Sequence, residues 1–285
     1  MKIMKTNTDF NQYLILNLSD YSIILKQKFL DCRQELSEAN VHDLRVSMRR
    51  LMAFTSLINN VYADYYSKSV YKELKKFLKI LNPLRDIQVQ LLAIEEMLDT
   101  AVHLYSFHQH LKRTESELIE QIKTSLTDSF LNTIEGLILF IRVDIKNKMR
   151  LRNFNIEDFF ETTNNAYEFM IGRGKEINPD QIDSIHRFRV SFKKYRYTLE
   201  VIKPFSGVTN KTMRKMKRFQ DILGDIQDNN VQYQLLDNFI KSVDLPSAQL
   251  YSPFIATILY KRRKMINTLM SKLNTLDQLQ FKLPS

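Results

Sequence analysis

The chain has 285 residues, of which 44% are hydrophobic and 26% charged, so a largely disordered protein is excluded and a folded globular one is expected. Its single cysteine, Cys32, excludes an intramolecular disulfide and a multi-cysteine metal site, and favours a reduced, cytoplasmic setting. The formal net charge of +10 leaves nucleic acid, acidic lipid and acidic protein open as partners.

Helices are predicted throughout, because Gly (5) and Pro (6) are scarce and apolar residues recur at helical spacing. The apolar run Tyr13–Leu25 contains polar residues and lacks a small-residue cleavage site, so it predicts neither a membrane span nor a signal peptide. No segment alternates with a period of two, so the expected fold class is all-α. In chain order, helices are predicted at Val41–Val61, Lys68–Leu81, Leu104–Arg152 (two long helices or one kinked helix), Ile185–Val201 and Thr212–Leu223, with breaks at Asn82–Pro83, Gly172–Pro179, Pro204–Asn210 and Asp244–Pro253.

The sequence contains an internal repeat. Val41–Ser47 (VHDLRVS) matches Ile185–Ser191 (IHRFRVS) at an offset of 144 residues, and Phe77–Leu81 (FLKIL) matches Phe219–Leu223 (FQDIL) at an offset of 142. Two separate motifs with nearly the same offset indicate a tandem duplication whose midpoint lies near residue 155. We therefore expect an N-terminal extension (residues 1–19), a first helical repeat (20–154) and a second (155–285), which together form one domain.

The basic residues are concentrated on four of the predicted helices. Residues 41–54, 68–79, 185–200 and 211–221 together carry a net charge of +14, so the rest of the chain nets −4. Within these helices, like charges recur at i,i+3 and i,i+4, where they lie on one face and repel, as at Arg45/Arg49 and Arg189/Lys193. A charged helix face is usually only solvated. The same pattern in four matched helices indicates instead that a bound anion relieves the repulsion.

These motifs resemble a known family. Val41–Leu51 and Ile185–Tyr197 are similar to the paired signatures of the CHAD family, the conserved-histidine α-helical domain, and Leu81–Val89 and Phe219–Asp228 resemble its two later segments. The resemblance covers about residues 20–275. It implies two helical bundles related by a pseudo-twofold axis, a basic central channel or cleft, and binding of inorganic polyphosphate without hydrolysis, as a localising, adaptor or sensing module.

The chain departs from the family pattern in three respects, one of which is the absence of tryptophan, which is common in the family's first-half signature. Met52 stands where the family often has an arginine matching Arg196, and Asn82-Pro83 replaces the usual glycine after Leu81. We interpret Asn82 as a residue at the C-terminus of a helix. From the basic faces and the resemblance together, the predicted polyphosphate-binding residues are His42, Arg45, Arg49, Arg50, Lys72, Lys75, Lys76, Lys79, His186, Arg189, Lys193, Lys194, Arg196, Arg214, Lys217 and Arg218.

The residue types suit a polyphosphate chain. Arginine offers paired donors to phosphate oxygens, lysine supplies a compact cation, and binding gains from the release of counterions. His42 and His186 lie on the basic faces, although each is also compatible with a structural histidine bonded to a backbone carbonyl. Asp86 and Asp228 are expected to be structural, capping the following helix or holding a neighbouring cation.

Other functions have weaker support in the sequence. A nucleic-acid binder is the alternative, but no aromatic residues alternate with the basic ones and no duplex-reading motif is present. Nothing predicts an enzyme, a cofactor or a metal site: no paired carboxylates have ligand spacing, and His103, His108 and His110 are expected to be surface residues. The cluster Lys261–Lys264 either extends the basic surface or is simply solvated.

Overall fold

The computed structural model of the chain describes residues 7–150, 155–244 and 248–281. The predicted all-α class is confirmed, because every regular element in these ranges is a helix. The elements are α1 (Asn7–Gln34), α2 (Glu38–Tyr62), α3 (Tyr65–Glu95), the short 3₁₀ turn η1 (Val102–Leu104), α4 (Tyr105–Lys123), α5 (Asp128–Arg150), α6 (Ile156–Lys175), α7 (Ile182–Ile202), α8 (Asn210–Ile240), α10 (Ser252–Leu273) and the 3₁₀ turn η2 (Leu276–Leu279). No helix of the described residues is long and apolar enough to cross a membrane.

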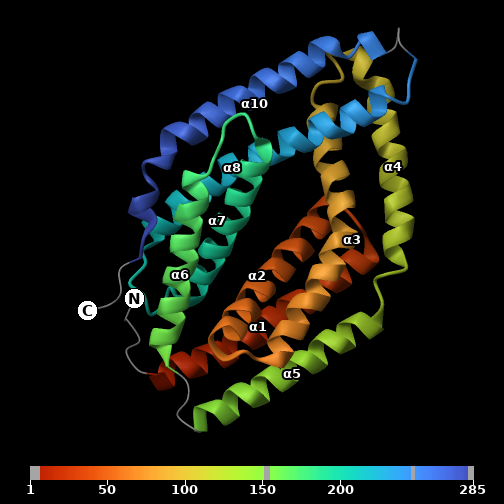
Figure 1. Cartoon of the computed structure of the whole chain (residues 1–285). Coiled ribbons are helices and arrows are strands. Elements are labelled where there is room, and N and C mark those ends of the chain that lie inside the picture. Colours follow the sequence, from red (N-terminus) through yellow and green to blue (C-terminus); the bar gives the residue numbers. More distant parts are fainter. Residues whose placement is uncertain (1–6, 151–154, 245–247, 282–285) are drawn as a thin grey trace.

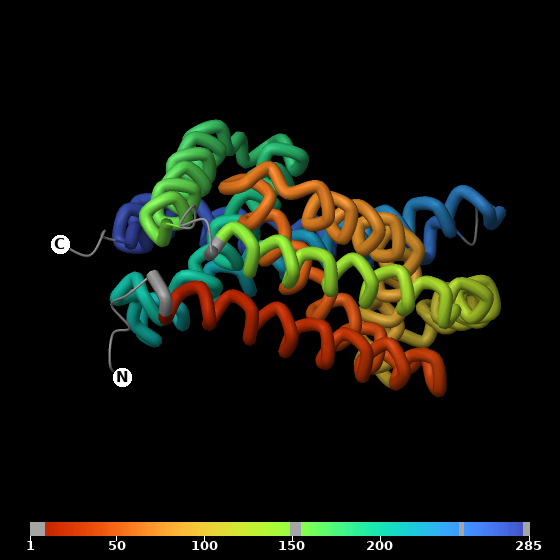
Figure 2. Tube along the Cα trace, turned by 90° about the horizontal axis from the view of Figure 1, so that it is seen from below, coloured from red at the N-terminus to blue at the C-terminus, as the bar shows by residue number. Residues whose placement is uncertain are grey.

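Two helix pairs occupy the middle of the molecule. The chain reverses between α2 and α3, where Ala63 adopts a left-handed conformation (φ 51°), and it reverses again between α7 and α8. Helix α1 packs on α2, α6 packs on α7, and α5 runs beside α1 and α3 (Figures 1 and 2). Helix α2 also packs against α7, and α3 against α8, so the two pairs face each other. The predicted basic faces all lie on these four helices.

One apolar core joins the predicted halves. It contains buried residues of α1, α2, α3 and α5 together with those of α6, α7, α8 and α10. A second, smaller core lies where the far ends of α3 and α8 meet α4 and α10. Residues 7–19, which the sequence analysis assigns to an extension, are part of α1, and the Phe10 ring lies 4.8 Å from Phe159 and 5.0 Å from Phe205.

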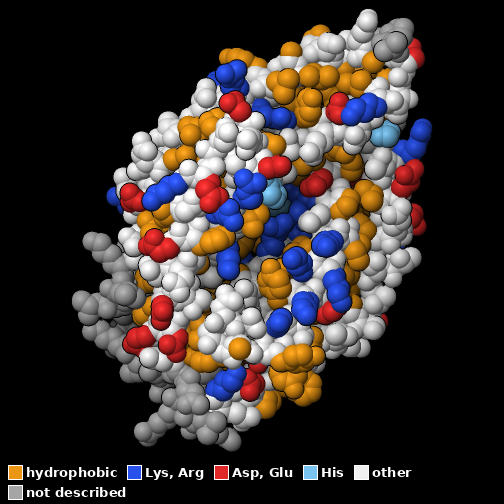
Figure 3. Space-filling view, in the orientation of Figure 1, with side chains coloured by type: hydrophobic (Ala, Val, Ile, Leu, Met, Phe, Trp, Pro, Cys, Tyr) orange, Lys and Arg blue, Asp and Glu red, His pale blue; other side chains and the backbone are white. Residues whose placement is uncertain are grey.

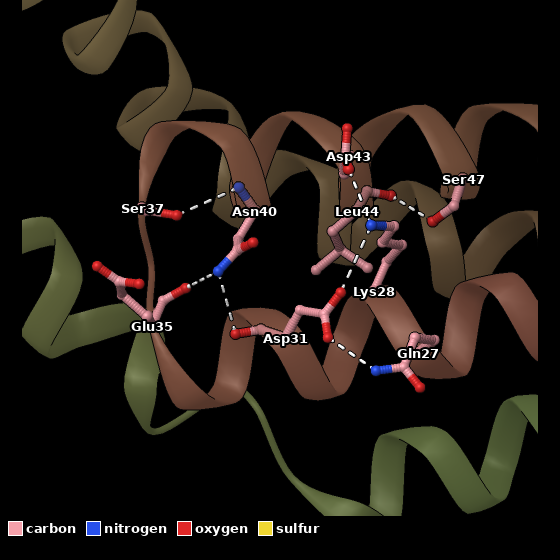
Figure 4. Close-up of polar contacts among 9 residues, drawn as sticks. All are labelled: Gln27, Lys28, Asp31, Glu35, Ser37, Asn40, Asp43, Leu44 and Ser47. Atoms are coloured by element: carbon pink, nitrogen blue, oxygen red, sulfur yellow. Dashed lines mark hydrogen bonds and ion pairs between the residues drawn. The ribbon is translucent and has the colours of Figure 1, made fainter.

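A network of polar contacts holds the start of α2 (Figure 4). Ser37 caps the helix by accepting a hydrogen bond from the Asn40 backbone N–H, at 3.3 Å. The Asn40 side chain donates to the carbonyl oxygens of Asp31 and Glu35, which ties α2 to the end of α1. These contacts fix where the first basic motif begins and therefore which residues face the centre of the molecule.

Most predicted helix boundaries are confirmed, but α3 and α8 both continue beyond the ends expected for them, α8 as far as Ile240. The break at Pro204–Asn210 separates α7 from α8, the segment from Leu104 forms the two helices α4 and α5, and α6 ends at Lys175 within the predicted Gly172–Pro179 break. The break at Asp244–Pro253 is only partly within the described residues. Helix α3, by contrast, continues through Asn82–Pro83 to Glu95.

Tertiary packing explains why Pro83 does not end α3. A proline inside a helix removes one backbone hydrogen bond, which costs about 3 kcal/mol. Leu78 and Leu81 before it, and Leu84 and Ile87 after it, are all buried, so the same apolar stripe continues on both sides of the proline. Burying each such side chain contributes about 1.5–3 kcal/mol, which outweighs the single lost bond.

Candidate functional site

Four cationic side chains from two helices approach one another where α2 faces α7. Arg45 and Arg49 come from α2, and Arg189 and Lys193 from α7; we call these four residues the central cluster. The opposite faces of both helices are buried, with Leu44 and Met48 on α2 matched by Phe188 and Phe192 on α7. The apolar faces therefore enter the core and aim the basic faces at each other.

The cluster is sufficiently enclosed and crowded to change its own protonation. The pKa of Lys193 falls to about 6, first because burial disfavours the charged amine and then because the three arginines repel it. Burial and Arg49 lower the pKa of Arg45 to about 10, and they lower that of Arg189 as well. Lys193 is therefore largely neutral in the free protein at neutral pH.

Two carboxylates face the cluster without closing ion pairs with it. Asp86 lies on α3 and Asp228 on α8, and burial raises the pKa of both while the cationic cluster opposes the rise. Asp228 is exposed to solvent, although surrounding protein displaces part of the water that would hydrate its carboxylate. No described carboxylate forms an ion pair with any member of the central cluster.

The expectation that Asp86 and Asp228 might cap a following helix is wrong. Both lie well inside their helices, α3 and α8, where all backbone N–H groups already have partners in the helix. Their second expected role, beside the cations, agrees with the electrostatic neighbours of each carboxylate. Both carboxylates therefore offset part of the positive charge of the cluster without forming an ion pair with it.

Hydrogen bonds to side-chain amides hold some of the basic residues. Arg45 donates from Nε (3.1 Å) and Nη2 (2.8 Å) to Oδ1 of Asn82. His186 Nδ1 lies 2.8 Å from Gln227 Oε1. Arg196 donates to Gln220 at 2.8 Å and pairs with Glu200 at 2.7 Å, so its charge is largely used within the protein. Sequence reasoning missed Asn82, because a contact 37 residues along the chain leaves no trace in local periodicity.

The remaining predicted residues form an exposed outer group. Lys76 pairs with Glu73 at 2.7 Å, and Lys217 pairs with Asp221 at 3.1 Å. His42 is exposed at the start of α2. Figure 3 shows Lys and Arg side chains gathered in and beside a hollow at the centre of this face, over α2, α3 and α7. The exposed predicted cations are Arg50, Lys72, Lys75, Lys76, Lys79, Lys194, Arg214, Lys217 and Arg218.

One acidic residue of the first motif is directed away from the cluster. Asp43 pairs with Lys28 of α1 at 2.9 Å (Figure 4), so its charge is neutralised on the other side of α2. Near the cluster, Arg85 of α3 forms an ion pair with Glu38 at the start of α2. The net positive charge at the centre is therefore not cancelled by the acidic residues nearest to it in sequence.

Two other basic or histidine groups differ from expectation. His108 is buried rather than exposed, with Nε2 3.2 Å from Glu95 Oε1, because it lies on the face of α4 that packs on α3. Arg262 is half-buried, donates to Asn229 and stacks on the Tyr233 ring at 5.0 Å, whereas Lys261 and Lys264 are exposed. Among the described residues, no group of three or more His, Cys, Asp or Glu side chains is arranged to hold a metal ion.

Comparison with known proteins identifies the fold. The family model of the CHAD domain matches residues 25–237, which is most of the chain. The structure is similar to the crystal structure of the CHAD domain from the plant Ricinus communis, with a TM-score of 0.68 and 16% sequence identity, over 100% of this chain and 96% of that chain. No curated protein matches the sequence.

Proposed function

The chain belongs to the CHAD domain family, and from this premise we propose that it binds inorganic polyphosphate, without hydrolysing it, at the central cluster and the exposed cations around it. The observation that carries the proposal is the approach of four basic side chains that no carboxylate of the described residues pairs with. Gathering like charges in a partly buried place costs free energy. A polyanion that enters the cluster regains that free energy as favourable contacts.

A linear phosphate polymer fits the arrangement better than a single small anion. The central cluster is flanked by exposed cations on α3 and α8, so a chain with about one negative charge per phosphate can contact both groups at once. Arginine side chains supply paired donors, and lysines adjust to the spacing of the chain. Affinity then comes from many contacts of about 1 kcal/mol each at the exposed positions, with stronger ones at the enclosed centre.

The proposal includes the architecture expected from the family resemblance. We infer that α2–α3 and α7–α8 are related by a pseudo-twofold axis and that the basic hollow between them is the binding cleft. In support, Ser47 donates to the Leu44 carbonyl at 2.8 Å, and Ser191, its equivalent, donates to the Phe188 carbonyl at 2.7 Å. Equivalent positions of the two repeats thus make the same local contact.

Binding without hydrolysis assigns the protein a localising, adaptor or sensing role, which we place in the cytoplasm, where the thiol of Cys32 stays reduced. The basic residues of the cluster bind the negatively charged phosphates of the intact ligand. Cleavage would further require a group that activates the attacking water. A phosphate-release assay on polyphosphate with added Mg²⁺ or Mn²⁺ tests this part, and sustained release would contradict it.

A calorimetric titration with polyphosphate tests the site. The variant Arg45→Glu/Arg49→Glu/Arg189→Glu/Lys193→Glu is expected to lose measurable binding while its helical circular-dichroism signal persists. A matched control reverses four exposed cations elsewhere, Arg113, Lys123, Lys241 and Lys272, and changes the net charge equally. The control should keep most of the affinity. An equal loss of affinity in both variants would mean that binding depends only on net charge, and would contradict a specific site.

Competition distinguishes the nucleic-acid alternative. Titrations at about 50 and 300 mM salt should show polyphosphate affinity that falls steeply with salt, as expected for counterion release. Single- or double-stranded DNA should displace polyphosphate poorly at the higher salt. Easy displacement there would favour nucleic acid as the ligand.

A further inference from the structure

The two sequence repeats have different residues at a position that, in the first repeat, forms hydrogen bonds with an arginine of the central cluster. Arg45 and Arg189 are equivalent in the first motif, and the second motif aligns Asn82 with Gly224. In the first half, Arg45 uses Nε and Nη2 to bond the Asn82 side chain. In the second half, Gly224 has no side chain to offer. The two equivalent arginines therefore differ, because Arg45 has a side-chain hydrogen-bond acceptor at this position and Arg189 does not.

Arg189 is left with an unused donor. Its Nε atom is buried and has no hydrogen-bond partner among the described residues. A Cβ atom built on Gly224 would have no other atom within 4 Å, so a side chain can begin there without a clash. A buried N–H without a partner is unfavourable and rare in folded proteins, and it calls for an acceptor.

The second half also lacks an ion pair that is present in the first. In the first half, Arg85 of α3 forms an ion pair with Glu38 of α2. Their equivalents are Gln227 and Ile182, which cannot form an ion pair. Together with Arg189 they line a small pocket between α7 and α8, with room for about one water-sized group.

We propose that the second half holds the specific phosphate contact of the site. In this contact Arg189 donates to a phosphoryl oxygen from the side-on edge of its guanidinium, which is formed by Nε and one Nη atom. Gly224, without a side chain, leaves this edge free for the ligand. Asn82 makes Arg45 a positioned cation whose side-on donors are already used. The Asn82 Oδ1 atom marks, in the first half, where an acceptor sits against that edge of the arginine. The proposal rests on the proposed function and adds an asymmetry to it.

Exchanging the glycine tests the proposal. In Gly224→Asn, the new amide oxygen should occupy the edge of Arg189 as Asn82 does for Arg45, and polyphosphate affinity should fall about tenfold, the loss of one charge-assisted hydrogen bond. Gly224→Ala is the matched control. It adds a Cβ into open space and favours the helix without supplying an acceptor, so its affinity should stay within about twofold of wild type.

A double-mutant cycle separates hydrogen bonding from obstruction. Arg189→Lys keeps the charge but removes the side-on donors, so adding Gly224→Asn to it should cause no further loss. Equal losses with and without Arg189→Lys, or equal affinity of the Asn and Ala variants, would overturn the proposal. If wild-type protein fails to bind polyphosphate, or if replacing all four residues of the central cluster by glutamate has no effect on binding, the proposed function itself is contradicted.

Discussion

Two groups of cations lie on the same face and differ in their surroundings. The central cluster is partly buried and made of side chains that repel one another, whereas the exposed lysines of α3 are surrounded by water. Each member of either group adds one positive charge to the formal count. Charge counted along the sequence therefore hides a difference in what each cation would contribute to the proposed binding.

The difference follows from solvation. An exposed lysine keeps its hydration shell, and salt screens its attraction to a phosphate, so a contact contributes about 0–1 kcal/mol. A cation in an enclosed cluster has already lost hydration during folding, which the low pKa of Lys193 records. A phosphate that reaches it gains a stronger interaction, because less water lies between the charges.

The largest expected effect comes from removing two phosphate contacts at the centre. Arg49→Gln/Lys193→Gln should weaken polyphosphate binding about a hundredfold, since each enclosed contact contributes about 1.4 kcal/mol. Lys75→Gln/Lys79→Gln removes two exposed basic side chains from α3 and should weaken binding only about threefold. Calorimetric titration of both variants under one set of conditions measures the ratio, and similar losses would abolish the distinction between the groups.

Much of the fold was predictable from the sequence. The apolar periodicity of residues 41–61 and 185–201 is regular, and packing in the core reinforces it, so these helices appear where they were expected. The failure at Pro83 has a clear cause: a local signal was outweighed by burial on both sides of the proline, which depends on helices distant in sequence. His108 illustrates the same limit, because its burial depends on the packing of α4 against α3.

The candidate site was predictable only in part. Periodicity places Arg45, Arg49, Arg189 and Lys193 on the basic faces of their helices. It does not show that the basic face of one helix lies opposite the basic face of the other. The separation of an enclosed cluster from exposed lysines arises from the packing of α2 against α7. The contact between Arg45 and Asn82 joins two helices, and only the three-dimensional structure shows it.

The second expected effect is a pH dependence that belongs to the central cluster alone. Lys193, with a pKa near 6, is mostly neutral in the free protein at pH 7–8 and must take up a proton to pair with phosphate. Polyphosphate affinity should therefore increase about tenfold as the pH falls from about 8 to about 6, and level off below that, where Lys193 is charged in both states.

Lys193→Arg provides the control for this pH dependence. Arginine stays charged over the whole range, so the part of the pH dependence that Lys193 causes should disappear. Binding titrations in buffers of different ionisation enthalpy should also show proton uptake by wild type and less by the variant. An identical pH profile in the two proteins would mean that another group, or the ligand itself, is responsible.

The smallest effect distinguishes two neighbours within the exposed group. Lys76 is paired with Glu73 at 2.7 Å, whereas no described carboxylate pairs with Lys72. A phosphate near Lys76 is repelled by Glu73 about as much as it is attracted by the lysine. Lys76→Gln should therefore leave the affinity unchanged, and Lys72→Gln should lower it about twofold. Glu73→Gln should raise the affinity by a similar factor, because it releases Lys76 for the ligand. If Lys76→Gln weakens binding more than Lys72→Gln does, then pairing within the protein does not determine which exposed cations take part.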